Sequence, residues 1–258
     1  MAELNGTAVD PSDLQSLALT NYGHFTSMRV ENGRRVRGLS LHLARLVRDC
    51  KTMFDAQLAP DRVRELAGRL APATGTAVVR VTVFDPALDL GHIGHDAEPH
   101  LLVTVRPAGD LPAPPLRAQS AVYVRDLPSV KSVGLLGSLY QRRQAQRAGF
   151  DDALFVDSQT LISEGGTWNI GFVQDGQVIW PDAPQLVGTT MELLQQAHPF
   201  AIRPVHLADL TGFDAAFATN VAIGVRAISQ IDDVKLPEAH PVIGELQRKF
   251  AELPSEQL

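Results

Sequence analysis

The chain has 258 residues, of which 45% are hydrophobic and 20% are charged, and its formal net charge at pH 7 is -6. This length can bury a substantial core in one or two domains, and the acidic balance without basic runs argues against nucleic acid or a membrane surface as a partner. The single cysteine, Cys50, excludes an internal disulfide and a cysteine-rich metal site, and it fits a reducing compartment.

Strand and helix patterns alternate before residue 106. Two strand-like runs on either side of Asn32-Gly33 predict a β-hairpin. Apolar residues at helical spacing follow, with Ser40 as the predicted N-cap, and a second helix is predicted to enter at Pro60. The runs TAVVRVTVFD and HLLVTVRP predict two further strands.

The segment 106–119, RPAGDLPAPPLRAQ, carries four prolines and a glycine and predicts a linker. After it we expect a strand at SAVYVRD, a helix near 138–148, and a meander of hairpins with turns at Asp157-Ser158 and Asp175-Gly176. The rest of the chain predicts a helix that begins after the loop LVGTT, then a β-rich stretch, and finally the helix PVIGELQRKFAEL. Mixed elements on both sides of the linker predict two α/β or α+β domains.

Neither a signal peptide nor a membrane span is visible in the sequence. The opening MAELNGTAVD has no basic segment followed by an apolar run, and no apolar run approaches the roughly 20 residues of a membrane helix. We therefore expect a cytoplasmic protein.

Lys131 lies in the stretch DLPSVKSVGLLGSL, between a strand-like run and a helix, among small and apolar residues. Desolvation disfavours an ammonium group, lowers the pKa of a lysine and frees the amine to form a Schiff base. The alternative is a lysine whose stem is buried and whose charge reaches solvent, which is the commoner role.

Three further features offer groups that such a lysine would need. Glu164, before two glycines, could keep a heterocyclic nitrogen protonated, and Arg45 could supply a bidentate guanidinium for a phosphate. Gly188, Thr189 and Thr190 precede an apolar helix and offer N–H groups and hydroxyls to one phosphate. The alternatives are a turn acid, a solvated helix arginine and a simple N-cap. Together these groups are the minimum set for pyridoxal phosphate.

The order and spacing of these residues resemble the class IV (fold type IV) pyridoxal-phosphate-dependent aminotransferase family, with its D-amino acid aminotransferases, branched-chain aminotransferases and aminodeoxychorismate lyases. The separation of 33 residues between Lys131 and Glu164 fits the pattern of that family. The matching stretches span about residues 22–232 and are YGHFTSMRVENG, HLARL, VKSVGLLGSLYQRRQAQRAGFDDALFVD, LISEGGTWNIGFVQDGQVIWPD, LVGTTMELL and FATNVAIGVRAISQID.

The resemblance implies a two-domain fold with a small α/β domain at 1–108, an interdomain linker at 109–118 and a larger β-rich, cofactor-binding domain at 119–258. It implies that Lys131 carries the cofactor aldimine and moves the proton, and that Glu164 pairs with the pyridinium nitrogen. The phosphate would be held by Arg45, Gly188, Thr189, Thr190, Asn220 and Val221. Members of the family act on amino acids and 2-oxo acids and are usually homodimers with the active site near the interface.

The sequence departs from the family pattern around the substrate. Met191 stands where the family commonly has an arginine, and Leu136 stands where branched-chain enzymes have a tyrosine. Candidates for the substrate pocket are Phe25, Arg29, Arg80 and Trp168; core packing and surface pairing are their alternatives.

Three functions stay open from the sequence. The leading one is an aminotransferase, the second is a lyase that releases pyruvate from an aminodeoxychorismate-like substrate, and the third is a non-catalytic scaffold of the same fold. The segment GHIGHDAEPH contains three histidines, but a polar loop is the expected structure and we expect no metal site.

Overall fold

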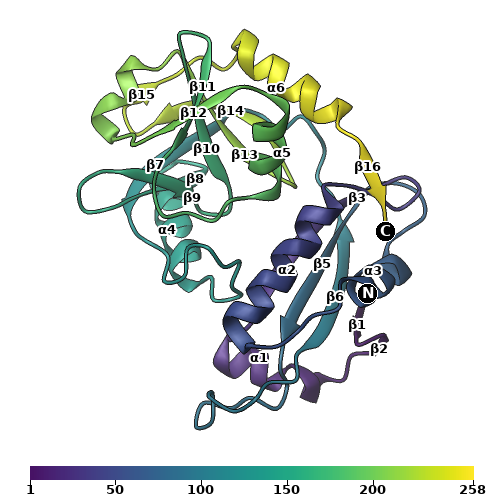
Figure 1. Cartoon of the computed structure of the whole chain (residues 1–258). Coiled ribbons are helices and arrows are strands. Elements are labelled where there is room, and N and C mark those ends of the chain that lie inside the picture. The colour runs from purple at the N-terminus through teal and green to yellow at the C-terminus, as the bar shows by residue number, and fades with distance from the viewer. The chain divides into compact units, whose positions relative to one another are not determined.

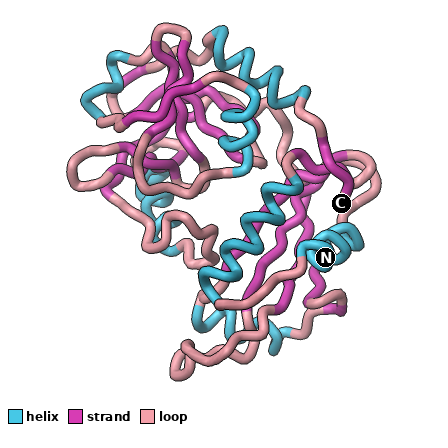
Figure 2. Tube along the Cα trace, viewed as in Figure 1, coloured by secondary structure: helices cyan, strands magenta, loops and turns pink.

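The chain divides into two structural units in the computed structural model, which describes all 258 residues (Figures 1 and 2). The first unit comprises Met1–Ala108, Val130–Gly134 and Pro254–Leu258, and the second comprises Gly109–Ser129 and Leu135–Leu253. Both units contain strands and helices, which confirms the predicted mixed fold class. None of the helices is long and apolar enough to cross a lipid bilayer.

An antiparallel sheet forms the first unit. Its strands are β1 (Ala2–Leu4), β2 (Thr7–Ala8), β3 (His24–Glu31), β4 (Arg35–Arg37), β5 (Ala77–Phe84), β6 (His100–Pro107) and β16 (Ser255–Gln257). They lie in the order β16-β4-β3-β5-β6-β1-β2. The helices are α1 (Gln15–Thr20), preceded by the 3-10 helix η1 (Pro11–Leu14), α2 (Leu39–Phe54) and α3 (Pro60–Leu70). Apolar side chains of α2 and α3 pack with those of β3, β5 and β6 in one core.

Local sequence explains most of this unit. Gly33 and Arg34 both have positive φ between β3 and β4, which confirms the predicted hairpin. The predicted N-cap of α2 is wrong: the helix begins at Leu39 after Gly38, whose φ is 68°. Ser40 lies within the helix, where its backbone N–H and its hydroxyl donate to Glu256 at 3.1 and 3.2 Å.

A nine-stranded sheet forms the second unit. Its strands are β7 (Leu116–Val122), β8 (Asp152–Val156), β9 (Ile162–Gly165), β10 (Asn169–Gln174), β11 (Gln177–Pro181), β12 (Phe200–Arg203), β13 (Ala215–Asn220), β14 (Gly224–Ile231) and β15 (Val234–Lys235). The order is β12-β11-β10-β13-β14-β7-β8-β9, and β15 pairs with β14. The helices are α4 (Leu136–Arg147), α5 (Thr189–Ala197) and α6 (Pro241–Glu252), with the 3-10 helix η2 (Leu207–Gly212).

Three apolar clusters lie against this sheet. Side chains of α5 and α6 pack with Trp180 and Phe217 in the first, and the second contains Phe172, which stacks on Phe213. The third and smallest packs α4 against β8. The turn at Asp175-Gly176, with φ of 51° and 75°, joins β10 to β11 as predicted. The strand predicted at 120–126 lies four residues earlier, because Leu116 and Ala118 are buried in the core while Val122 is exposed.

A buried polar layer lies between α2 and the sheet of the first unit. His24 is fully buried and neither ring nitrogen has a hydrogen-bond partner. Burial, and to a lesser extent the Arg45 guanidinium, lower the pKa of His24 to about 3. Burial likewise lowers the pKa of His42 well below its usual range, with smaller contributions from Arg45 and Lys131. Both imidazoles are therefore neutral in the folded protein at pH 7.

We expect His24→Leu to reduce the sensitivity of the fold to acid. An unfolded chain protonates His24 near pH 6.5, whereas the folded chain does so near 3. Above pH 6.5 His24 does not make the stability depend on pH, but between pH 6.5 and 3 only the unfolded chain binds the proton, so the free energy of unfolding falls by about 1.4 kcal/mol per pH unit as the pH decreases. Urea unfolding at pH 7 and pH 5 should show a shallower loss in the variant. The control is His95→Leu, which removes an exposed histidine; equal losses in wild type and His24→Leu would contradict the expectation.

Candidate active site

Lys131 lies in the short segment Val130–Gly134, whose backbone pairs with the beginning of β3. The N–H of Phe25 donates to the Lys131 carbonyl at 2.9 Å, and the neighbouring residues His24 and Ser132 form an antiparallel bridge. The N–H of Lys131 donates to the carboxylate of Asp49, on α2, at 3.0 Å. This pairing groups the lysine with the first unit, whereas the sequence interpretation assigned it to the larger domain.

The side chain of Lys131 lies beside an aromatic ring. Its Nζ is 5.0 Å from the centroid of the Phe25 ring, and the Arg80 guanidinium carbon is 3.6 Å from the same centroid. Both cations are thus within the range of cation–π attraction. The structure therefore brings two predicted pocket residues to the lysine, and Lys131 has a second cation nearby rather than purely apolar neighbours.

The strand register places Arg29 and Arg80 on one face of the first unit's sheet, whereas Arg45 contacts the other face. Phe25 lies opposite Thr82 and Arg29 opposite Val78, so Phe25, Arg29 and Arg80 share one face. Thr26 points to the other face, where α2 packs, and its hydroxyl accepts a hydrogen bond from Arg45. Arg45 is buried, which excludes the alternative of a solvated helix arginine.

His42 completes the contacts of the Thr26 hydroxyl. The Nδ1 atom of His42 lies 2.6 Å from Thr26 Oγ1 and 3.5 Å from Arg45 Nη2. Since arginine can only donate, the hydroxyl accepts from Arg45, and its own proton is available to His42 Nδ1. Burial keeps this imidazole neutral, so Arg45 is aligned by a neutral hydroxyl and a neutral ring.

Glu164 lies at the end of β9 in the second unit and is buried. Its Oε1 accepts the N–H of Leu186 at 3.3 Å and lies 3.6 Å from Nη1 of Arg125, whose side chain is only 13% exposed. Sequence reasoning missed Arg125, because nothing in its spacing linked it to a carboxylate 39 positions later. The contacts with Arg125 and Leu186 therefore fix the orientation of the buried Glu164 carboxylate.

The entry to α5 is held by Asn169. Its Nδ2 donates to the Leu186 carbonyl at 2.7 Å, and its Oδ1 accepts the N–H of Gly188 at 3.1 Å. A Cβ at position 188 would lie 2.3 Å from that Oδ1, so the contact requires glycine. The first N–H groups of a helix have no partners within the helix, so Thr189 and Thr190 at the start of α5 can bind an anion.

Two buried hydroxyls of the second unit lack a partner within the protein: those of Thr190 and Thr219. Thr219 was not among the sequence candidates, although it directly precedes Asn220. The Asn220 carboxamide oxygen accepts the N–H groups of Ala222 and Ile223 at 2.8 and 3.0 Å and so shapes the turn that contains Val221.

Trp168 is a buried side chain of the second unit. The side chain is 4% exposed and belongs to a core, and its indole N–H donates to Asp152 at 2.9 Å. It is therefore a packed, hydrogen-bonded residue, and the substrate-pocket role stays a prediction. Met191 is also a core residue, packed with the apolar side chains under the sheet, while Leu136 is 84% exposed.

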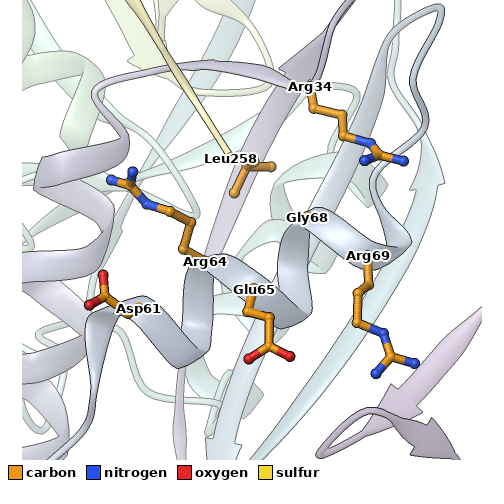
Figure 3. A pocket seen from close by; sticks show the side chains of 7 residues that line it. All are labelled: Arg34, Asp61, Arg64, Glu65, Gly68, Arg69 and Leu258. Carbon is orange, nitrogen blue, oxygen red and sulfur yellow. The ribbon is translucent and has the colours of Figure 1, made fainter.

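A surface pocket of about 430 Å³ in the first unit contains none of the predicted site residues. The side chains of Arg34, Arg64 and Arg69 around it point in different directions and do not converge on one point (Figure 3). No group of three or more His, Cys, Asp or Glu side chains is arranged to hold a metal ion.

Residues 23–231 match the family model described as amino-transferase class IV. A protein of Methanocaldococcus jannaschii, described as a putative branched-chain-amino-acid aminotransferase, is 26% identical over 275 residues, which cover 96% of this chain and 93% of the relative. A second relative, a probable branched-chain-amino-acid aminotransferase of Rickettsia typhi, is 31% identical over 37% of the chain and 35% of its own length.

Solved structures share the fold over nearly the whole chain. The branched-chain aminotransferase from Thermoproteus uzoniensis with norvaline has a TM-score of 0.85 at 20% identity and covers 97% of this chain and 93% of its own. A hypothetical aminotransferase from Mycobacterium tuberculosis, in its PLP-bound form, has a TM-score of 0.81 at 19% identity and covers 97% of both chains. The family model spans most of the chain, so this protein belongs to the class IV aminotransferase family, as its sequence and fold class predicted.

Proposed function

We propose that this class IV aminotransferase uses pyridoxal phosphate to move an amino group between apolar aliphatic amino acids and their 2-oxo acids. The observation that carries the substrate class is the near full-length match to a relative described as a putative branched-chain-amino-acid aminotransferase. The apolar ring of Phe25 beside Lys131 is consistent with an aliphatic substrate side chain.

The residues present fit the cofactor. The M. tuberculosis structure is a PLP-bound form, and a further structure that shares the fold is complexed with N-(5'-phosphopyridoxyl)-L-glutamate. In this chain the buried hydroxyls of Thr190 and Thr219 have no partner within the protein, which is unfavourable unless a ligand supplies one. A phosphate at the start of α5 would accept from both hydroxyls and from the free N–H groups.

Each candidate residue then has a distinct task. Pyridoxal phosphate, when bound, supplies the electron sink for bonds broken at the substrate Cα. Lys131 would hold the aldehyde carbon of the cofactor and move the proton at the substrate Cα. Glu164, oriented by Leu186 and Arg125, would hold the proton on the pyridine nitrogen, and Arg45 would neutralise phosphate charge.

The relative and the solved structures described above, which match most of the chain, are described as aminotransferases, and this does not favour the pyruvate-releasing alternative. The retained Lys131, Glu164 and Arg45 count against a non-catalytic scaffold, because a scaffold has no physical need for all three. A homodimer in the cytoplasm stays our prediction for the assembly and its location.

Reductive trapping tests the role of Lys131. We expect borohydride treatment of the protein loaded with pyridoxal phosphate to attach the label to Lys131 and to leave Lys51, Lys235 and Lys249 unlabelled in peptide mass maps. Lys131→Ala should lose the near-visible absorption band of the bound cofactor and the half-reaction. Lys51→Ala, which changes an exposed helix lysine, is the control. A label on another lysine would refute the assignment.

The same absorption band tests the substrate class. We expect L-leucine, L-isoleucine and L-valine to bleach the band as the cofactor is converted to its amine form, and D-amino acids to bleach it slowly. Rapid bleaching by D-alanine alone would contradict the proposed donors while leaving the aminotransferase assignment intact.

The variant Thr190→Val tests whether the Thr190 hydroxyl serves phosphate binding rather than the stability of the fold. Since the Thr190 hydroxyl is buried without a partner, its removal should leave the cofactor-free protein as stable as wild type or about 1 kcal/mol more stable. The same change should weaken the binding of pyridoxal phosphate and leave the binding of pyridoxal, which lacks the phosphate, unchanged. Thermal unfolding and absorption titration measure the two effects; equal weakening for both ligands would contradict a phosphate role.

A further inference from the structure

A fully hydrogen-bonded carboxylate lies beneath the turn that joins β9 to β10. Asp152 is buried at the start of β8. Its Oδ1 accepts Nε of Arg142 at 2.9 Å and the N–H of Ala153 at 2.8 Å. Its Oδ2 accepts Nη2 of Arg142 at 2.7 Å and the indole N–H of Trp168 at 2.9 Å. An ionised carboxylate offers about four acceptor positions, so every position on Asp152 is used.

The same groups fix the turn itself, residues 165–168. Nη2 of Arg142 also donates to the Thr167 hydroxyl at 2.6 Å, and the N–H of Gly165 donates to the Trp168 carbonyl at 2.8 Å. A Cβ at position 165 would lie 2.0 Å from the Trp168 ring, and one at Gly166 would lie 2.6 Å from Asp152 Oδ1. Both glycines are therefore required by the indole and the carboxylate that pack against the turn.

Two residues at the ends of the turn hold the segment that enters α5. Glu164 directly precedes the turn and accepts the N–H of Leu186, while Asn169 directly follows it and bonds the Leu186 carbonyl and the Gly188 N–H. A displacement of the turn would therefore move the buried carboxylate and the start of the helix together.

We propose that Arg142 is a positioning residue for the cofactor site. Through Asp152, Trp168 and Thr167 it fixes the turn 165–168, and through the turn it sets the Glu164 carboxylate and the start of α5. The inference rests on the proposed function, because it takes Glu164 and Thr190 as cofactor contacts. Arginine suits this position because its planar fork bonds both carboxylate oxygens and the hydroxyl in one fixed geometry, which an ammonium group reproduces only in part.

Arg142→Met removes the fork, and the neighbouring Arg143→Met is the matched control, because Arg143 is exposed on the same helix. Amide hydrogen exchange of the cofactor-free protein is the first measurement. We expect Arg142→Met to speed exchange at Gly165, Gly166, Leu186 and Gly188 and to leave the core amides of β10 and β13 unchanged. Arg143→Met should match wild type throughout.

Cofactor binding and kinetics are the second measurement. We expect Arg142→Met to weaken pyridoxal phosphate binding and to slow the half-reaction by up to about 100-fold, with the KM for the amino donor unchanged and partial rescue by Arg142→Lys. The double variant Arg142→Met/Glu164→Gln should lose less activity than the product of the two single losses. The reason is that Arg142 acts through the position of the Glu164 carboxylate, which the second change has already removed.

The outcomes separate this inference from the proposed function. A wild-type protein that shows neither an absorption band nor a half-reaction refutes the function, while hydrogen exchange still tests the turn. Equal exchange and equal cofactor affinity in Arg142→Met and Arg143→Met, or fully multiplicative losses with Glu164→Gln, would overturn the inference. If Arg142→Met does not fold, Trp168→Phe takes its place: it keeps an aromatic ring but lacks the N–H to Asp152, and it should change exchange and affinity in the same direction.

Discussion

The backbone pairing between residues 131–133 and the beginning of β3 is the constraint on which the first unit's chemistry depends. It fixes the lysine next to Phe25, and the Asp49 carboxylate on α2 holds the same peptide from a second direction. A side chain as long as that of lysine loses much conformational freedom when it must act at one place. Holding its backbone at two points reduces the number of positions that its amine can reach.

Buried polar groups of the second unit fall into two opposite classes. Asp152 uses all of its acceptor positions, which makes it part of the framework. The hydroxyls of Thr190 and Thr219 have none of their hydrogen bonds made within the protein, which is the expected state of groups that serve a ligand. This difference distinguishes supporting residues from binding residues among side chains that are equally buried.

Periodicity and turn residues predicted most elements of the fold, because they act over a few positions. The hairpin at Asn32-Gly33, the helix entered at Pro60 and the turn at Asp175-Gly176 follow from local sequence. Arg125 and Thr219 could not be found in this way, since their importance depends on contacts between distant segments or on a missing partner. The bond from the Trp168 indole to Asp152 could not be predicted for the same reason, because it joins two segments that are apart in the sequence. Met191, which departs from the family pattern, packs in an apolar core.

Gly165 and Trp168 constrain each other's replacement. The indole covers the space that any side chain at position 165 would need, so a larger residue at 165 is tolerated only after the tryptophan has been replaced by a smaller one. The reverse order is open, because a smaller residue at 168 leaves glycine at 165 without a clash. Replacement of both residues therefore has a required order, in which position 168 changes before position 165. The opposite order passes through a protein in which a side chain at position 165 clashes with the indole.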